Sequence, residues 1–257
     1  MIRLENVSLT FEDKVILDNI SLSIKKGEIA VILGPSGAGK SSIIKIMVGL
    51  WQPDSGRVFI GNKNISKLSE SEMLPLRRKM GIVFQSNALF DSLTVEENVS
   101  YFLKEHGGLK NSVINEKVSE ILSFINLKGT EKTCIDQLSG GMKKRVAIAR
   151  ALSFDPEIIF YDEPTTGLDP INAKSILDLI KRVSERGATS IVVTHILNDA
   201  VSIGDTLSVI NDGTVVQTGT VQDMLASENK FVKDFFYEVY QDAALLKNKK
   251  FINKTNT

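Results

Sequence analysis

The chain of 257 residues is long enough for one large domain or two small ones, and its 42% apolar content is ordinary for a folded protein. The 31 basic and 31 acidic side chains cancel, so no electrostatic argument makes nucleic acid the main partner. The single cysteine, Cys134, cannot form an internal disulfide, which fits a reducing, cytosolic compartment. No apolar run approaches the roughly 20 residues that span a bilayer, and the N-terminus lacks the pattern of a signal peptide, so we expect any membrane part in another chain.

Residues 1–27 alternate between apolar and polar side chains, which predicts short antiparallel strands separated by a turn at 12–14. Phe11 lies just before this turn. Its ring could stack on an adenine or could be an ordinary strand aromatic, and spacing alone favours the ordinary aromatic.

A glycine-rich segment at 34–41 follows a buried strand predicted at 28–33 and precedes a helix predicted at 42–50. It matches the G-x-x-x-x-G-K-[ST] phosphate-binding loop at every fixed position. Glycines let successive N–H groups face phosphate oxygens, Lys40 offers positive charge to the β- and γ-phosphates, and the Ser41 hydroxyl suits Mg²⁺. The residues predicted to bind ATP here are Gly34, Pro35, Ser36, Gly37, Ala38, Gly39, Lys40, Ser41 and Ser42.

The next region continues the alternation of strands and helices. A turn at 53–56 leads to a strand at 57–60, and a short helix is predicted at about 70–80. A second buried strand follows at 81–84, and Gln85 closes it.

Residues 86–155 are predicted to form a helical insertion between strands of the sheet. A capping box at 94–97 opens one helix, and apolar residues at helical spacing predict another over 113–124. Ser139, Gly140 and Gly141 precede a third helical stretch at 142–152. A serine and glycines at the start of a helix can form a second anion-binding end. Two copies of the chain with two nucleotides bound between them would explain why one chain has two such ends. Alternatively, Ser139 is a plain N-cap.

Strands are predicted again at 158–161 and 189–194, with a helix between them that begins at the Asp-Pro pair 169–170 and stops at Gly187. A hairpin is predicted at 207–216. The alternation of strands and helices predicts an α/β protein with a parallel sheet.

Polar residues follow the predicted strands, at the edge where open α/β sheets bind ligands. Asp162 is placed to hold Mg²⁺, and Glu163 is placed to orient and polarise the attacking water. Gln85 and His195 are placed to sense the γ-phosphate. With Lys40, these residues predict hydrolysis of the nucleotide as well as its binding.

These motifs, in this order, resemble the nucleotide-binding subunits of ABC transporters, and the resemblance covers roughly residues 1–225. It implies an ATPase with a P-loop NTPase (RecA-like) core, an N-terminal antiparallel β subdomain and an inserted α-helical signature subdomain at about 86–155. The matching segments are the Walker A motif at 34–41, the Q-loop glutamine Gln85, the signature at 138–142, the Walker B motif at 158–163, the D-loop at 167–169 and the switch histidine His195.

The resemblance also implies roles for single residues. Phe11 falls where the family has its adenine-stacking aromatic, which reverses the interpretation from spacing. Gln85 touches Mg²⁺ in the family, so the implied metal ligands are Ser41, Gln85 and Asp162. Gln85 also adjoins the coupling helix of the membrane permease. Residues of the signature and D-loop, Ser139, Gly140, Gly141 and Asp169, are implied contacts of the nucleotide.

The signature departs from the family at its last position, where Met142 replaces glutamine and Lys143-Lys144-Arg145 follows. Together with residues 88–95, this is similar to the Mla-type subfamily, whose ATPases drive phospholipid traffic. The resemblance implies a homodimer at the cytoplasmic face of the inner membrane. Its implied partners are a permease, an MCE-domain lipid-binding protein and a small STAS-domain regulator.

Residues 226–257 are expected to form a C-terminal helix and a mobile tail. An apolar stripe on the helix either packs on its own domain or docks on a partner, and the resemblance favours the partner. The stripe consists of Phe231, Phe235 and Val239 with Val232, Phe236 and Tyr240.

Two rival functions share these motifs. An ABC ATPase of another transporter, or of a non-transport assembly machine, would carry every residue named above. A protein that binds nucleotide only as a structural switch is disfavoured because Lys40, Asp162, Glu163 and His195 are all present.

Overall fold

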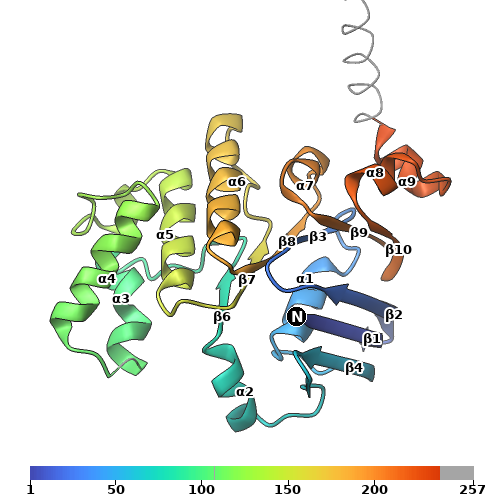
Figure 1. The fold of residues 1–257 in the computed structure, drawn as a ribbon, viewed down its shortest axis with the longest axis horizontal. Coiled ribbons are helices and arrows are strands. Elements are labelled where there is room, and N and C mark those ends of the chain that lie inside the picture. Colours follow the sequence, from blue (N-terminus) through green and yellow to red (C-terminus); the bar gives the residue numbers. More distant parts are fainter. Residues whose placement is uncertain (107, 238–257) are drawn as a thin grey trace, which may run out of the picture.

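The computed structural model describes residues 1–106 and 108–237. Figure 1 shows two sheets lying against each other and a separate group of helices, α3, α4 and α5, to one side. The smaller sheet has four strands, in the spatial order β2 (Lys14–Ile24), β1 (Ile2–Phe11), β4 (Ser55–Ile60) and β5 (Lys63–Asn64). The larger sheet has six strands, in the order β10 (Thr214–Gly219), β9 (Thr206–Asn211), β3 (Ile29–Leu33), β8 (Thr189–Thr194), β7 (Ile158–Asp162) and β6 (Met80–Val83).

The smaller sheet is antiparallel, and the larger sheet is parallel except for its edge strand β10. Every residue of β3 and β8 is buried, because both faces of a parallel sheet are covered. The helices that lie between strands are α1 (Lys40–Met47), α2 (Glu70–Arg77), α3 (Val95–His106), α4 (Asn111–Phe124), α5 (Gly140–Leu152), α6 (Pro170–Glu185) and α7 (Leu197–Ile203), with a 3₁₀ turn at Ile135–Gln137. Helices α8 (Val221–Leu225) and α9 (Lys230–Phe235) follow the last strand.

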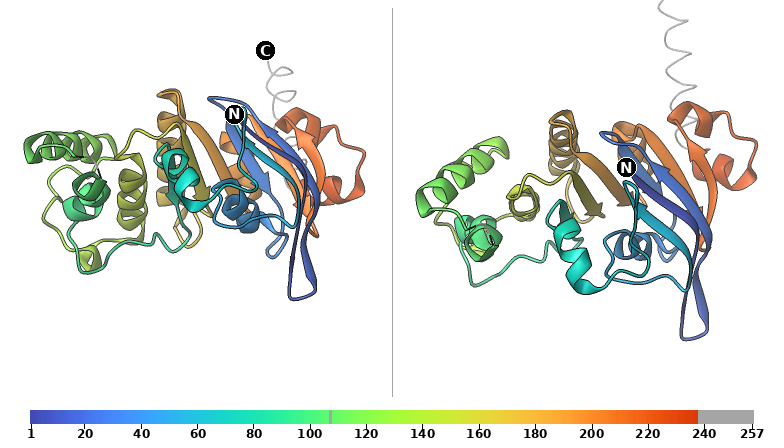
Figure 2. Two further views of the ribbon diagram at one scale, coloured as in Figure 1. Left: turned by 90° about the horizontal axis from the view of Figure 1, so that it is seen from below. Right: turned by 60° about the horizontal axis from the view of Figure 1, so that its bottom comes forward.

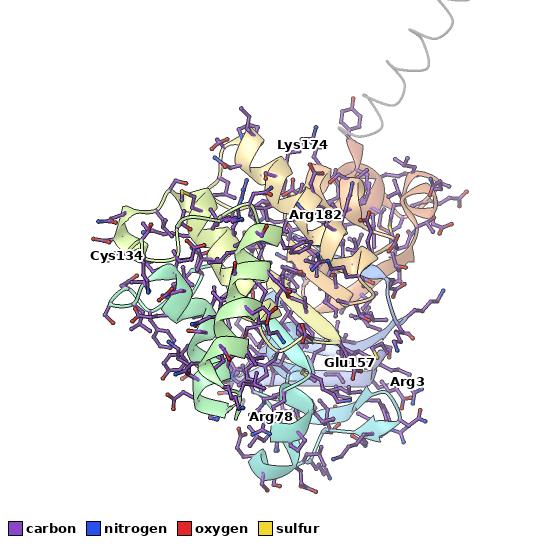
Figure 3. The ribbon with its side chains drawn as sticks, turned by 60° about the vertical axis from the view of Figure 1, so that its left-hand side comes forward. Arg3, Arg78, Cys134, Glu157, Lys174 and Arg182 are labelled. Carbon is purple, nitrogen blue, oxygen red and sulfur yellow. The ribbon has the colours of Figure 1, made fainter. Side chains whose placement is uncertain are left out.

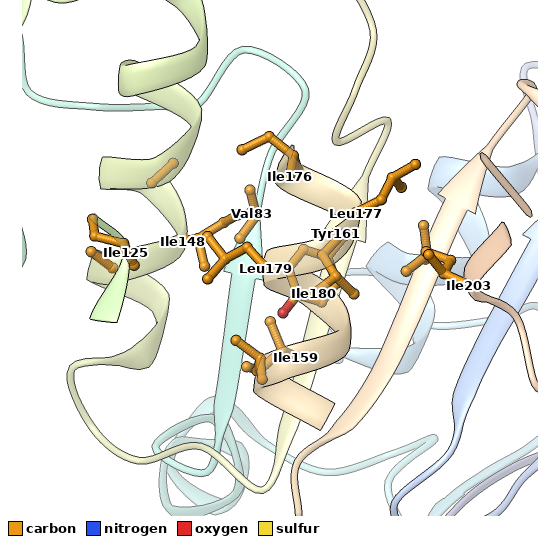
Figure 4. Packing of buried hydrophobic residues seen from close by; sticks show 14 of the residues in the cluster. Val83, Ile125, Ile148, Ile159, Tyr161, Ile176, Leu177, Leu179, Ile180 and Ile203 are labelled. Carbon is orange, nitrogen blue, oxygen red and sulfur yellow. The ribbon is translucent and has the colours of Figure 1, made fainter. Parts of the chain in front are cut away.

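The larger sheet separates two hydrophobic clusters, because successive side chains of a strand point to opposite faces. In β7, Ile159 and Tyr161 join the cluster under α5, α6 and α7, whereas Phe160 joins the cluster on the side of α1 and the smaller sheet. Figure 4 shows Ile148 of α5 and Ile180 of α6 near Ile159 and Tyr161. Figure 2 shows the same layers from two further directions.

The predicted fold class is confirmed: a parallel core, an antiparallel N-terminal sheet, and helices α3 to α5 inserted between β6 and β7. The boundaries given for the insertion and for the domain end at residue 225 stay predictions. Helix α1 begins at Lys40, two residues before the predicted start, because Gly39 caps it in a left-handed conformation with φ 94°. The short elements β5, α7 and α8 were not predicted.

The apolar stripe of the C-terminal helix packs on its own chain. Val232 and Phe236 are buried in the cluster under α5, α6 and α7, and Phe231 and Phe235 lie against that cluster. The expectation that the stripe docks on a partner is therefore wrong for Val232 and Phe236, and for the partly buried Phe231 and Phe235 it stays a prediction. Val239, Tyr240 and the expected mobile tail lie outside the described residues. Within the described residues, no helix is long and apolar enough to cross a membrane.

Candidate nucleotide-binding site

The candidate site forms where three neighbouring strands of the parallel sheet end. β3 leads into Gly34, β7 ends at Asp162, and β8 leads into His195. Because these strands are parallel and adjacent, their carboxyl ends meet at one edge. The structure therefore confirms that these predicted residues share an edge, although their roles stay predictions.

The loop at 34–41 depends on glycine for its shape. Gly37 and Gly39 have φ values of 83° and 94°, in the left-handed region that side chains disfavour. A Cβ at Gly34 would collide with the carbonyl oxygen of Ile210 at the end of β9. The loop thus turns tightly into α1, whose N-terminal N–H groups carry partial positive charge.

Lys40, the first residue of α1, folds back over this loop. Its Nζ donates hydrogen bonds of 2.9 Å to the carbonyl oxygens of Gly34 and Pro35, and it lies 3.8 Å from Glu163 Oε1. Only 6% of Lys40 is exposed. Burial lowers the pKa of Lys40, and the negative charges of Glu163 and Asp162 oppose that shift. The ammonium group is therefore held against the loop at 34–41, close to Glu163.

Asp162 and Ser41 form an oxygen pair suited to a hard cation. The Ser41 hydroxyl donates a hydrogen bond of 2.9 Å to Asp162 Oδ1. Burial raises the pKa of the Asp162 carboxyl, and the hydrogen bond from Ser41 acts against this shift. Oxygen donors of this kind are what Mg²⁺ prefers, so the residues fit that ion. Among the described residues, no group of three or more His, Cys, Asp and Glu side chains forms a metal cluster of its own.

Glu163 directly follows β7 and is held from several sides. Its backbone has φ 49°, an uncommon value for a non-glycine residue, and its N–H donates to the Val193 carbonyl at 2.9 Å. Glu163 Oε2 lies 2.9 Å from His195 Nδ1 and accepts a hydrogen bond of 3.0 Å from the Thr166 hydroxyl. The carboxylate is 8% exposed, and a strained backbone at such a point is typical of functional sites. Its position lets it act as a base toward water at the loop.

Three supporting residues were missed by the sequence analysis: Thr165, Thr166 and Asp199. The Thr165 hydroxyl donates a hydrogen bond to Asp199 on α7, which links the segment after β7 to the segment after β8. Burial raises the pKa of the Asp199 carboxyl. Nothing in the sequence marks this contact, because α7 is short and its pairing with the threonine is set by the fold.

Phe11 lies at an exposed aromatic corner. It is 47% exposed, and its ring centroid is 4.9 Å from that of Trp51 at a tilt of 55°. Lys45 of α1 lies 4.1 Å over the Trp51 ring. The structure thus places an open aromatic face beside α1, which a planar base could cover. Trp51 was not predicted as part of the site.

The signature residues form the N-terminus of α5. The Ser139 hydroxyl accepts a hydrogen bond of 3.3 Å from the Met142 N–H, so Ser139 is an N-cap. Ser139 and Gly140 are exposed, and within the described residues no hydrogen bond joins them to the loop at 34–41. Figures 1 and 2 show α5 and α1 in separate parts of the ribbon. One copy of the chain therefore does not bring its two anion-binding ends together.

Asp169 and Gln85 are also separate from the cluster around Glu163. The Asp169 carboxylate caps α6, where it accepts hydrogen bonds of 3.0 Å from the Ile171 and Asn172 N–H groups, so a contact of this carboxylate with nucleotide stays a prediction. Asn172 in turn lies against Gly141. Gln85 is exposed, and the contact that the structure gives it is through its carbonyl oxygen, which accepts from Lys144 at 2.9 Å. Its role as a metal ligand is likewise a prediction.

The chain is similar to known proteins along most of its length. The family profile described as ABC transporter matches residues 17–166. The intermembrane phospholipid transport system ATP-binding protein MlaF of Haemophilus influenzae is 39% identical over 236 residues, which cover 91% of this chain and 89% of that protein. The methionine import ATP-binding protein MetN of Carboxydothermus hydrogenoformans is 41% identical over 87% of this chain and 67% of its own length.

A solved structure shows the same fold. The dimeric, post-hydrolysis state of the ATP-binding cassette MJ0796, bound to ADP and Pi, matches with a TM-score of 0.79 and 36% identity. That match covers 86% of this chain and 99% of the cassette. The profile spans more than half of the chain and the relatives match most of it, so this chain belongs to the ABC transporter family and is one of its ATP-binding ATPase subunits.

Proposed function

We propose that this chain is the ATP-hydrolysing subunit of a phospholipid transporter. The observation that supports this substrate class is the likeness to the phospholipid transport protein MlaF along 91% of the chain. The departure at Met142 and Lys143-Lys144-Arg145, which resembles the Mla-type signature, points the same way.

The chemistry assigned to the site is transfer of the γ-phosphoryl group to water. Glu163, fixed by His195 and Thr166, orients the water and accepts its proton, and Lys40 stabilises charge on the phosphoryl group. Ser41, Asp162 and Gln85 are the residues that would hold Mg²⁺. The bound ion would neutralise charge on the β- and γ-phosphates.

We infer that the working form is a homodimer. The exposed N-terminus of α5, at Ser139 and Gly140, lies apart from the phosphate loop of its own chain, so a second copy is needed to complete a site with both anion-binding ends. The dimeric state of the similar cassette MJ0796 supports this inference.

A group of exposed aromatic residues beside Gln85 is the proposed contact surface for a membrane permease. Phe84, Phe90 and Phe102 are all exposed, and the Phe90 and Phe102 rings contact Tyr101 at centroid distances of 4.6 Å and 5.5 Å. Exposed apolar groups of this kind mark interaction sites. From the resemblance to Mla-type ATPases, we also propose a location at the cytoplasmic face of the inner membrane, with an MCE-domain protein and a STAS-domain regulator as further partners.

The test is affinity purification of the tagged chain from detergent-solubilised native membranes, with every co-purifying protein and lipid identified. Phe102→Asp is the disruptive variant. Val15→Asp is its control, because Val15 is another exposed apolar residue, at 59%, on the smaller sheet. We expect a permease with bound phospholipid in the wild type and in Val15→Asp, but not in Phe102→Asp.

The alternative outcomes separate the rival functions. Recovery of a permease for an amino acid or another solute would leave the proposed ATPase chemistry intact but contradict phospholipid as the substrate. The similar match to MetN makes transport of such a solute the specific competing proposal. Recovery of the chain without any permease would favour a non-transport assembly ATPase.

A further inference from the structure

Lys144 is a buried cation that the proposed chemistry does not use. It is 2% exposed, and no carboxylate of residues 1–106 or 108–237 lies within ion-pair distance of its Nζ. The Nζ instead donates to the backbone carbonyl oxygens of Gln85, at 2.9 Å, and Phe84, at 3.4 Å. Burial lowers the pKa of Lys144, and the charge of Asp162 opposes the shift. A buried ammonium group costs free energy unless it has partners, so these two carbonyls hold it in place.

Arg150, six residues further along α5, makes the same kind of contact with the same loop. Its Nη1 donates to the Ala88 carbonyl at 2.6 Å, and its Nη2 donates to the Asn87 carbonyl at 3.1 Å. Six residues of helix span about 9 Å, so the loop that leaves β6 runs along α5 rather than away from it. Asn87 and Ala88 have positive φ values of 66° and 49°, which are uncommon without glycine and need support from neighbours.

We propose that Lys144 and Arg150 form a carbonyl clamp that fixes the loop at 84–90 to the signature helix α5, so that Gln85 and the Ser139-Gly140 end move as one unit. The clamp makes Lys144 a positioning residue for Gln85. The clamp is inferred from the hydrogen bonds of Lys144 and Arg150 alone, whereas its effect on hydrolysis rests on the proposed function. The clamp also gives a physical use to Lys144, one of the two adjacent lysines that follow Met142 in the signature of this chain.

Two further contacts limit how the loop and α5 can separate. A Cβ at Gly81 of β6 would lie only 2.8 Å from the Ala151 carbonyl oxygen of α5, so strand and helix approach closely here. The buried Asn98 of α3 pairs with Phe90 through hydrogen bonds of 2.9 Å and 3.1 Å, which fix the far end of the loop. The first part of the loop, at 84–88, is therefore the part that depends on Lys144 and Arg150.

The test compares Lys144→Met with Lys143→Met in the full-length chain. Both variants lose one positive charge from adjacent positions, but within the described residues the Lys143 side chain has no hydrogen bond or ion pair. Hydrogen–deuterium exchange of the backbone at 84–88 is the first measurement, and it needs no nucleotide. We expect Lys144→Met to raise exchange there at least tenfold, Lys143→Met to leave it unchanged, and Lys144→Arg to restore protection.

The second measurement is the rate of ATP hydrolysis in the same variants and in combination with Gln85→Ala. We expect Lys144→Met to lower kcat about tenfold without lowering the melting temperature, because a buried cation is replaced by an apolar side chain of similar length. If the lysine acts through Gln85, the double variant Lys144→Met/Gln85→Ala will be no slower than Gln85→Ala alone. Additive losses would show that Lys144 does not act through Gln85.

The two measurements fail in different ways. Equal exchange at 84–88 in Lys144→Met and Lys143→Met overturns the clamp, whatever the chain hydrolyses. Absence of hydrolysis by the wild type overturns the proposed function, while a specific rise of exchange in Lys144→Met would still establish the clamp.

Discussion

Replacing Glu163 by glutamine removes one negative charge from the site while keeping its shape. The substitution retains an oxygen that can accept from His195 and Thr166, whose bonds to Glu163 are 2.9 Å and 3.0 Å. It also leaves Lys40 with its two carbonyl acceptors, at 2.9 Å each, and with the nearby charge of Asp162. The Lys40 contact with Glu163 is longer, at 3.8 Å, so we expect the fold to survive its loss.

The expected effect on the rate follows from the role of Glu163 as a base. Removing a general base typically lowers a rate by about 10² to 10⁴, which corresponds to roughly 3 to 5 kcal/mol in the activation free energy. Binding of ATP should be retained or strengthened, because the substitution removes a negative charge that faces the phosphates. ATP should therefore accumulate in a closed dimer that forms but does not turn over.

The assays are phosphate release under steady-state conditions and size-exclusion chromatography with ATP. Glu157→Gln is the matched control, because Glu157 precedes the first residue of β7 and Glu163 follows its last. Glu157 forms an exposed ion pair of 2.7 Å with Lys79, of a kind that contributes about 0 to 1 kcal/mol, and Figure 3 labels it on the molecule. If Glu163→Gln keeps more than about a tenth of the wild-type kcat, Glu163 is not the base.

Four further results are expected. Lys40→Ala should abolish measurable hydrolysis while the protein remains folded by circular dichroism; turnover near the wild-type rate would remove Lys40 from the site. Trp51 is the only tryptophan of the chain and contacts Phe11, so binding of ATP or ADP should change its fluorescence. Phe11→Ala should weaken nucleotide binding roughly 5- to 100-fold. An unchanged fluorescence signal would show that the adenine ring binds elsewhere. Gly140→Ala places a Cβ 3.7 Å from Leu168, which is an ordinary contact, so the melting temperature should be unchanged. Hydrolysis should fall, because the added methyl group would crowd the nucleotide bound to a second copy of the chain. Full activity would contradict the proposed dimer with nucleotide between its chains. Burial raises the pKa of Asp162, so on acidification its carboxylate is lost at a higher pH than that of an exposed Asp. The Mg²⁺ concentration needed for half-maximal hydrolysis should therefore begin to rise above the ordinary titration range of Asp, and a profile that stays flat through that range would exclude Asp162 as the ligand that titrates.

The sequence was sufficient for features that depend on local chemistry. The helix start at Asp169 and the capping box at Thr94 and Glu97 are present as predicted, because a side chain and a backbone group a few residues apart decide them. The strand at Thr189–Thr194 was predicted with its bounds, because a β-branched apolar run is buried on both faces.

Contacts between distant segments could not be predicted in the same way. The order of the larger sheet places β3 between β8 and β9, and this order brings Asp162 to Ser41 across 121 positions of sequence. The sequence analysis placed Asp162 directly after a strand and Ser41 at the end of the phosphate-binding loop, but their separation could not be predicted. The burial of Lys144 was equally hidden, because a lysine next to two other basic residues is typical of an exposed helix face.

The buried charges near the strand ends determine which other groups a polyphosphate needs in order to bind at this edge. Lys40 and Lys144 are nearly inaccessible ammonium groups. The charges of Glu163 and Asp162 act on Lys40, and the charge of Asp162 alone acts on Lys144. The carboxylates limit the cost of burying Lys40, whereas backbone carbonyl oxygens limit the cost of burying Lys144. Phosphates add negative charge that Asp162 and Glu163 would repel, so binding needs the N–H groups at the start of α1 and a divalent cation beside Ser41 and Asp162. The contacts separate the two lysines. Lys40 binds carbonyls of the phosphate loop, where we propose that it acts on the ligand, whereas Lys144 binds carbonyls of the loop after β6, where we propose that it positions Gln85.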